Sequence, residues 1–307
     1  MLITILGPTA SGKTKLAVSL AGGMGAEIIS GDSRQVYRKM DIGTGKDLNE
    51  YTYKGSPVPY HLIDICEPGE KYSVFRFQND FYRVFAEIKS RERSPILCGG
   101  SGLYIEAVVR SYELPDVPPN PALRESLKGK SIAELSTMLA VAKSMHNTSD
   151  IKSPHRAIRA IEIEEYRRQH HVDYKSRPGF FPVIIGLDIE RDLRRRRISE
   201  RLRDRLEQGM VSEVQSLLDS GLSVEDVMYY GLEYKFVTLY ITGKLNHSEM
   251  FVRLETAIHQ FAKRQMTWFR GMERRGCTIK WIDASLPLDA QVEIAHQTIA
   301  NSSPYEH

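Results

Sequence analysis

The 307-residue chain has few cysteines, no long apolar run and little net charge. Its three cysteines, Cys66, Cys98 and Cys277, form no C-x-x-C pair, which argues against a disulfide framework and a structural zinc site. No apolar stretch approaches the roughly 20 residues that a bilayer requires, and no basic flank of a secretory leader precedes the first apolar run. We therefore expect a cytoplasmic protein without a membrane partner. A net charge of +3 is too small to predict a nucleic-acid partner by itself.

Strand and helix signals alternate through the first third of the chain, which contains no internal repeat and no low-complexity tract. Strands are predicted at 2–6, 27–30, 60–65 and 95–100, and helices at 13–21 and 74–88, where apolar residues recur at helical spacing. Strands that alternate with helices indicate a parallel sheet with helices on both faces. In such sheets ligands bind beyond the carboxyl ends of the strands.

A helical insertion interrupts this pattern. Four prolines within 115–121 mark a connector, a capping box at 131–134 opens one helix, and Pro154 lies in the first turn of another. A buried strand at 180–189 resumes the sheet, and the C-terminal third is predicted to be helical with one late strand at 278–283. The fold class is thus α/β, a P-loop-type parallel sheet flanked by helices. We expect a catalytic core of residues 1–115 and 178–307 and an insertion domain of residues 116–177.

The segment GPTASGKT at residues 7–14 fits the phosphate-binding pattern G-x-x-x-x-G-K-[ST]. It follows a predicted strand and opens a predicted helix, which is the context that the pattern requires. Backbone N–H groups in such a loop and at the helix N-terminus favour an anion. Lys13 adds a positive charge, and the hydroxyl of Thr14 can hold Mg²⁺. The loop alone leaves open whether the anion is ATP, GTP or another polyphosphate.

Two further turns follow predicted strands. In the turn SGDSRQ, Asp32 can bind Mg²⁺ through water or act as a general base, or it can only cap the turn. Arg34 and Gln35 offer donors suited to phosphate or to a base edge. The turn GGSG at 99–102 adds the hydroxyl of Ser101, and its alternative is a plain strand-to-helix turn. Because all these turns follow parallel strands, we expect them to converge with the phosphate loop.

A strongly basic helix is predicted within residues 189–210. Ile198, Leu202 and Leu206 form an apolar stripe, and arginines occupy the other faces. Interspersed Asp and Glu predict ion pairs within the helix, which would leave one or two arginines for an anionic substrate.

A second basic helix is predicted within residues 257–276. It places lysine and arginine beside Trp268 and Phe269, a combination suited to RNA phosphates and unstacked bases. The alternative for each of the two rings is packing in the core.

Together these segments resemble the tRNA dimethylallyltransferases, also called tRNA isopentenyltransferases, in order and over nearly the whole chain. The matching segments are GPTASGKT, EIISGDSRQVYRKMDIGTGK, HLIDICEP, GGSGLY, HRAIRAIE, RISERLRDRLEQGMVSEV and KRQMTWFR. DSRQVY with MDIGT is far more specific than the phosphate loop, because ordinary P-loop kinases lack it. The zinc-finger tail of some eukaryotic members is not found, so we expect the bacterial type.

The resemblance implies that the loop holds dimethylallyl diphosphate with Mg²⁺. The dimethylallyl group would pass to the exocyclic N6 amine of the adenosine on the 3′ side of the anticodon in tRNA, with release of diphosphate. Catalytic roles are implied for Asp32, which takes the proton from the amine, and for Lys13 and Thr9, while Thr14 would hold the metal. The insertion domain would grip the anticodon stem-loop, and we expect a monomer.

The resemblance also implies two sets of ligand contacts. The diphosphate ligands are Gly7, Pro8, Thr9, Ala10, Ser11, Gly12, Lys13 and Thr14, with Arg197, Arg201 or both. The tRNA contacts are Asp32, Ser33, Arg34, Gln35, Ser101, His155, Arg156, Arg159, Lys263, Arg264, Gln265, Thr267, Trp268 and Arg270.

The chain departs from the family pattern in three places. The family commonly has Thr in place of Ser101, and it reads GTAKP where this chain reads GTGKD. Near residue 231 the family usually reads GYKE, whereas this chain reads GLEY. Leu232 and Glu233 thus replace an aromatic and a basic residue, and we assign no RNA contact to them.

Three rival functions remain at this point: an ATP-dependent small-molecule kinase, an enzyme that prenylates free AMP or ADP, and a non-catalytic RNA-binding protein. A prenylating enzyme for free nucleotides would have no use for the insertion. The intact Gly12, Lys13, Thr14 and Asp32 argue against a protein without catalytic activity.

Overall fold

The computed structural model describes residues 1–142, 153–170 and 177–302. The chain divides into two compact units, Met1–Ser111 with Pro178–His307, and Tyr112–Arg177. Each unit is described by itself.

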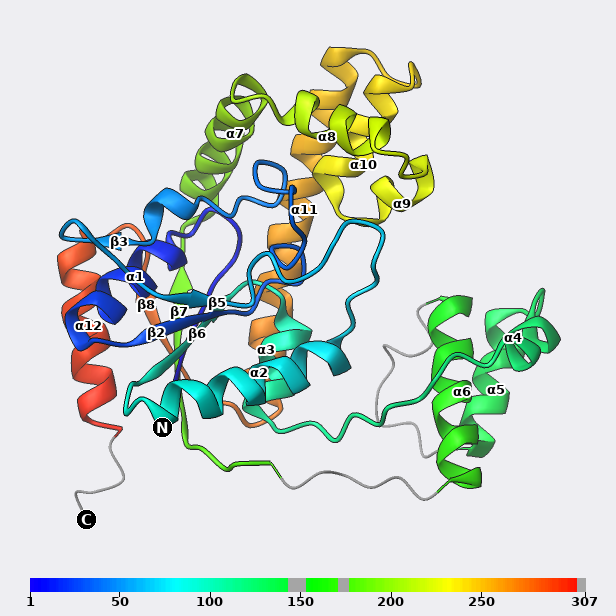
Figure 1. Ribbon diagram of the computed structural model, residues 1–307, viewed down its shortest axis with the longest axis horizontal. Coiled ribbons are helices and arrows are strands. Elements are labelled where there is room, and N and C mark those ends of the chain that lie inside the picture. The colour runs from blue at the N-terminus through cyan, green and yellow to red at the C-terminus, as the bar shows by residue number, and fades with distance from the viewer. Residues whose placement is uncertain (143–152, 171–176, 303–307) are drawn as a thin grey trace. The chain divides into compact units, whose positions relative to one another are not determined.

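The first unit is built on a parallel sheet with the strand order β5-β2-β6-β1-β7-β8 (Figure 1). Its strands are β1 (Leu2–Leu6), β2 (Glu27–Ser30), β5 (Tyr60–His61), β6 (Pro95–Gly99), β7 (Pro182–Asp188) and β8 (Ile279–Asp283). A small antiparallel ribbon is formed by β3 (Thr52–Tyr53) and β4 (Ser56–Pro57). The predicted α/β fold is confirmed.

Helices cover both faces of this sheet because the side chains of each strand alternate between two apolar cores. Ile3 and Ile5 face the core shared with α1 (Lys13–Met24) and α12 (Leu288–Ala300). Leu2 and Leu6 face the core shared with α2 (Val74–Ser90), α3 (Gly102–Val109), α7 (Arg191–Glu207) and α11 (His247–Arg274). None of the helices in the described residues is both long and apolar enough to span a membrane.

The remaining helices of this unit pack on the same two cores. The 3-10 helix η1 (Leu48–Glu50) packs on the core that contains Ile3, and α8 (Met210–Asp219), α9 (Val224–Tyr229) and α10 (Leu232–Ile241) pack on the core that contains Leu2. Figure 1 shows α8, α9 and α10 grouped around one end of α11.

The predicted strand at 60–65 is wrong beyond its first two residues. Leu62 and Asp64 adopt left-handed backbone conformations, with φ of 60° and 55°, which a strand cannot accommodate. The segment instead bonds to the turn after β2, since Asp64 N–H donates to Gln35 O at 3.1 Å and Ile65 N–H donates to Val36 O at 2.8 Å. These bonds link the segment to the turn that carries Asp32.

The second unit contains α4 (Pro121–Leu127), α5 (Ile132–Ala142) and α6 (Pro154–Gln169). The predicted capping box opens α5, with Ser131 and Glu134 bonded reciprocally, and Ser153 caps α6 ahead of its N-terminal proline. Leu127, Leu135, Leu139, Ala157 and Ile161 form its small core. The parts of the predicted insertion at 143–152 and 171–176 lie outside the described residues.

Candidate active site

The phosphate loop joins β1 to α1, and the N-terminus of α1 is open. Gly12 occupies the N-cap position with a left-handed φ of 86°, which glycine adopts without steric cost. No side chain caps this end of α1, and its first turn has no acidic residue. The amide groups of a first helical turn have no partner within their own helix, so this end favours an anion.

Gln265 of α11 connects the phosphate loop to the GGSG turn. Its Oε1 accepts a hydrogen bond from the Thr9 N–H at 2.9 Å, and its Nε2 donates to Gly100 O at 2.9 Å. The resemblance assigns Gln265 to RNA, but here both ends of the buried amide bond to the protein backbone. The sequence gives no signal for this, because 256 residues separate Gln265 from Thr9.

The turn that carries Asp32 meets the GGSG turn through two serines. Ser33 N–H donates to Ser101 Oγ at 3.0 Å, and the two hydroxyls lie 3.2 Å apart. Asp32 Oδ1 accepts from Arg34 N–H at 2.9 Å, so the carboxylate does cap the turn while remaining half-buried. The expected convergence of the three turns is confirmed by these contacts and by those of Gln265.

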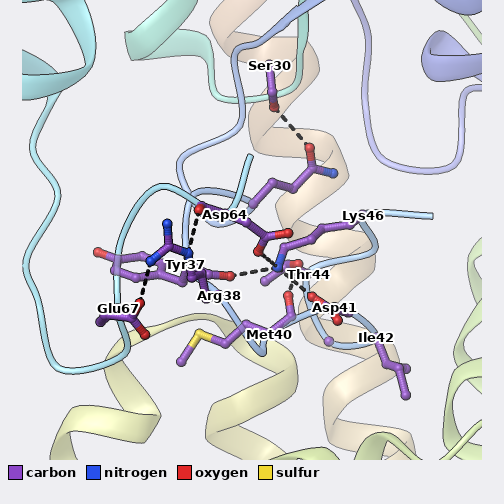
Figure 2. A network of polar contacts seen from close by, with 12 residues as sticks. Ser30, Tyr37, Arg38, Met40, Asp41, Ile42, Thr44, Lys46, Asp64 and Glu67 are labelled. Carbon is purple, nitrogen blue, oxygen red and sulfur yellow. Dashed lines mark hydrogen bonds and ion pairs between the residues drawn. The ribbon is translucent and has the colours of Figure 1, made fainter. Parts of the chain in front are cut away.

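Lys46 holds the loop that follows Asp32 together (Figure 2). Its side chain is only 1% exposed, and Nζ donates to Tyr37 O at 2.7 Å, to Asp41 at 2.5 Å and to Asp64. On the same loop, Gln35 Nε2 donates to Gly45 O at 3.0 Å. From the sequence, DIGTGK offers Thr44 and Lys46 on a flexible turn, with a plain surface loop as the alternative. The structure instead shows a buried ammonium group that binds oxygens of Tyr37, Asp41 and Asp64.

Glu213 of α8 binds the opposite side of this loop. Its two carboxylate oxygens accept the N–H groups of Asp41, Ile42 and Gly43 at 2.7, 2.8 and 3.0 Å. The hydroxyl of Tyr234 donates to Oε1 at 2.7 Å. Sequence reasoning did not find Glu213, because its partners are backbone groups about 170 residues away.

Three arginines of α7 lie in different surroundings. Arg201 forms an ion pair with Asp47, and Arg205 Nη2 lies 3.8 Å from the same carboxylate. Arg197 instead points toward β8, where Nη1 approaches Ala284 O at 3.5 Å. Within the described residues the ion pairs of α7 all go to Asp47, so the predicted pairing inside the helix is wrong.

Five ionisable groups of the phosphate site influence one another. Burial lowers the pKa of the Lys13 ammonium; the nearby Cys98 and Asp32 oppose this, and Arg201 and Arg205 add to it. Burial also raises the pKa of the Cys98 thiol to about 12, so Cys98 is a neutral group under the loop. The positive charges of Arg201 and Arg205 thus act on Lys13 at a site that favours anions.

Lys263 and Arg270 of α11 line a cavity of about 570 Å³ between this helix and the start of α7. The polar residues of the lining are Asp188, Arg191, Arg194, Lys263, Thr267 and Arg270. Within the described part of the chain, none of the four basic side chains forms an ion pair. One carboxylate against four cations makes this cavity suitable for phosphate groups.

The other predicted residues of α11 have mixed surroundings. Phe269 is fully buried in the core, which confirms the alternative that this ring packs in the core. Arg264 stacks on Phe261. The ring of Trp268 packs against Gly102, where a Cβ would lie 2.3 Å from it, and its buried Nε1 has no hydrogen-bond partner in the described structure.

In the second unit, His155 and Arg156 are exposed on α6. Arg159 forms an ion pair with Glu162 and donates to Val117 O at 2.8 Å. Glu162 also pairs with Arg124 at 2.9 Å. Arg159 therefore holds α6 to the incoming connector, whereas His155 and Arg156 are open to a partner.

Comparison with known proteins identifies the family. Residues 35–272 match the family described as IPP transferase. This chain belongs to the IPP transferase family. The resemblance stated from the sequence is thereby confirmed, and these comparisons give no support to the kinase alternative.

Family members of known name cover nearly the whole chain. A tRNA dimethylallyltransferase 2 of Phocaeicola vulgatus is 59% identical over 292 residues, which is 95% of each chain. A tRNA dimethylallyltransferase 1 of Porphyromonas gingivalis is 60% identical over 292 residues, covering 95% of this chain and 97% of that one. The crystal structure of a tRNA isopentenylpyrophosphate transferase from Bacillus halodurans matches with a TM-score of 0.71 and 34% identity, covering 98% of this chain and 95% of that one.

Proposed function

We propose that this IPP transferase moves the dimethylallyl group of dimethylallyl diphosphate to the N6 amine of the adenosine that follows the anticodon in tRNA. Diphosphate is the second product. The observation that carries the proposal is the convergence of an uncapped phosphate loop with the turns of Asp32 and Ser101, in a chain about 60% identical to proteins named for this reaction.

The reaction breaks the bond between C1 of the dimethylallyl group and the diphosphate oxygen, and it forms a bond between C1 and N6. The open N-terminus of α1, Lys13 and Arg201 bind the diphosphate and stabilise the negative charge that grows on it as it leaves. Asp32 accepts the proton that N6 loses. Its Asx-type bond to Arg34 N–H fixes the carboxylate orientation, so one oxygen stays available to the amine.

The residues at this site fit Mg²⁺ bound together with a diphosphate. The described residues contain no group of three or more His, Cys, Asp and Glu that would hold a metal without a substrate. Mg²⁺ often takes one or two protein oxygens and completes its shell with substrate phosphates and water. The Thr14 hydroxyl would supply one such oxygen, with Asp32 acting through water. When bound, Mg²⁺ neutralises charge on the diphosphate.

The basic cavity beside α11 supports an RNA substrate. An adenine must leave the stacked anticodon loop before its amine can react, which costs a few kcal/mol and requires a firm grip on the backbone. Arg191, Arg194, Lys263 and Arg270, which form no ion pair among the described residues, supply four cations for that grip. In the second unit, His155 and Arg156 of α6 would contact the anticodon stem-loop.

Transfer of radiolabelled dimethylallyl groups to three acceptors tests the proposal. Bulk tRNA, AMP and a non-RNA acceptor are offered in parallel, with and without Mg²⁺. We expect label in tRNA alone and only with the metal. Label in AMP would replace the tRNA enzyme by one that modifies free nucleotides, and an absence of label in all three would refute the proposal.

Calorimetric titration separates the proposal from the kinase. We expect dimethylallyl diphosphate with Mg²⁺ to bind more tightly than ATP, because no segment can be assigned to position an attacking water or to clamp an adenine. Tighter binding of ATP with turnover would favour the kinase.

A further inference from the structure

We infer that Arg205 is a further diphosphate-binding residue, and that Glu233 acts as its counter-ion while the diphosphate is absent. Arg205 lies in the matching segment RISERLRDRLEQGMVSEV and Glu233 in the departing GLEY, but the sequence assigns neither residue a role. The inference deepens the proposed function and rests on it.

Arg205 lies one helical turn beyond Arg201 on α7, and the two guanidinium groups reach the same place. Both lie against Gly45, where an added Cβ would be 1.6 Å from Nη2 of Arg205 and 2.8 Å from Nη2 of Arg201. Gly45 has a left-handed φ of 63°, a conformation that favours glycine. The two arginines also lie so close to it that an added Cβ would clash with them. Asp47, two residues on, contacts both of them.

The site of Arg205 is continuous with the phosphate loop. Lys15, in the first turn of α1, pairs with Glu50 of η1 at 3.7 Å, and η1 begins directly after Asp47. The segment from Gly45 to Glu50 therefore spans from the arginines of α7 to the N-terminus of α1. The charges of Arg201 and Arg205 both act on the Lys13 ammonium across this distance.

The guanidinium of Arg205 is incompletely satisfied. Its side chain is only 11% exposed, its Nε is buried with no hydrogen-bond partner in the described residues, and its single ion pair is 3.8 Å long. A buried donor without a hydrogen-bond acceptor lowers the stability of the fold, and a bound ligand that accepts this hydrogen bond removes that cost. Arginine presents a planar fork of donors that suits phosphate oxygens.

Glu233 supplies the balancing negative charge. It lies at the start of α10, half-buried, and within the described residues it forms no ion pair with either arginine. Burial raises the pKa of its carboxyl, whereas the nearby positive charges of Arg205 and Arg201 act to lower that pKa. A bound diphosphate would be attracted by Arg205 and repelled by Glu233, so the two residues would have opposite effects on affinity.

Binding of inorganic diphosphate in the presence of Mg²⁺, measured by calorimetry on the full chain, tests this inference. Arg205→Met keeps the length and apolar stem of the side chain, and we expect it to weaken binding by about 10- to 100-fold, as for a lost charged hydrogen bond. Glu233→Gln should tighten binding by roughly threefold or more, because a like charge is removed. Arg203→Met is the matched control, since Arg203 is exposed on the same helix and stacks on Phe251.

If Arg205→Met alone fails to fold, the double variant Arg205→Met with Glu233→Met removes both half-buried charges. Its affinity for diphosphate can then be compared with that of the wild type. Wild-type affinity for diphosphate in a folded Arg205 variant would overturn the inference, as would weaker binding by Glu233→Gln. Failure of the proposed function looks different, because the wild type would then bind diphosphate but transfer nothing to tRNA. A wild type that does not bind diphosphate would overturn both.

Discussion

Replacement of Gln265 by methionine removes a side chain that links the phosphate loop to the GGSG turn. Methionine has nearly the same length and volume, so packing on α11 is kept and only the two hydrogen bonds are lost. The replacement leaves the Thr9 N–H and the Gly100 carbonyl without their partner. An unsatisfied buried polar group costs about 1–3 kcal/mol.

The two groups together set the expected loss. The bond to Gly100 is buried, whereas the bond to Thr9 is partly open to water, which can replace part of it. Two such groups would together cost about 2–6 kcal/mol, and because water can replace part of one bond we expect the free energy of unfolding to fall by about 2–4 kcal/mol. The loop would also lose its fixed geometry, so diphosphate affinity should fall at least about tenfold.

Urea unfolding and calorimetric titration with diphosphate measure the two effects. The control is Gln297→Met on the exposed face of α12, which should change stability by less than about 0.5 kcal/mol. Gln265→Glu tests the same bonds through the pH dependence of stability. It keeps the acceptor for Thr9 and can donate to Gly100 only when protonated, so its stability should rise as the pH falls. Wild-type stability and diphosphate affinity in Gln265→Met would refute this reasoning.

Three further predictions concern catalysis, RNA binding and pH. Asp32→Asn keeps the acceptor for Arg34 N–H but loses the charge, so single-turnover transfer should fall about 10²–10⁴-fold with dimethylallyl diphosphate still bound; normal turnover in a folded variant would exclude Asp32 from the chemistry. The affinity for tRNA should fall linearly on a log–log plot against salt, and Arg270→Gln should reduce the slope by about 1; an unchanged slope would mean that this cavity contacts no phosphate. Burial by itself raises the pKa of the Glu162 carboxyl, but hydrogen bonds from Arg124, Asn120 N–H and Arg159 hold it below its ordinary value of 4.5. Its contribution is thus present above about pH 4.5 and is lost as the pH falls through the lowered pKa, so amide exchange of α6 should accelerate in acid in the wild type and depend less on pH in Glu162→Gln.

Local patterns in the sequence were sufficient for most elements of the fold. The alternating β-branched runs and the apolar stripe at 74–88 predict β1, β2, β6 and α2, because side-chain periodicity follows directly from strand and helix geometry. The segment at 60–65 shows where this reasoning stops. Its apolar pattern suits a strand, but the contacts of Asp64 with Lys46 and of Ile65 with Val36 turn the chain away from the sheet.

The sequence by itself determined the family, the phosphate loop and the turn of Asp32, since each depends on residues that are neighbours along the chain. Only the tertiary structure decided which distant groups complete the site. Gln265, Glu213 and Arg205 act on backbone or charged groups at least 100 residues away, and a linear pattern carries no information about such pairs. The different surroundings of Arg197 and Arg201 likewise appear only in the tertiary structure, because the direction of each side chain depends on how α7 packs beside the loop that contains Gly45 and Asp47.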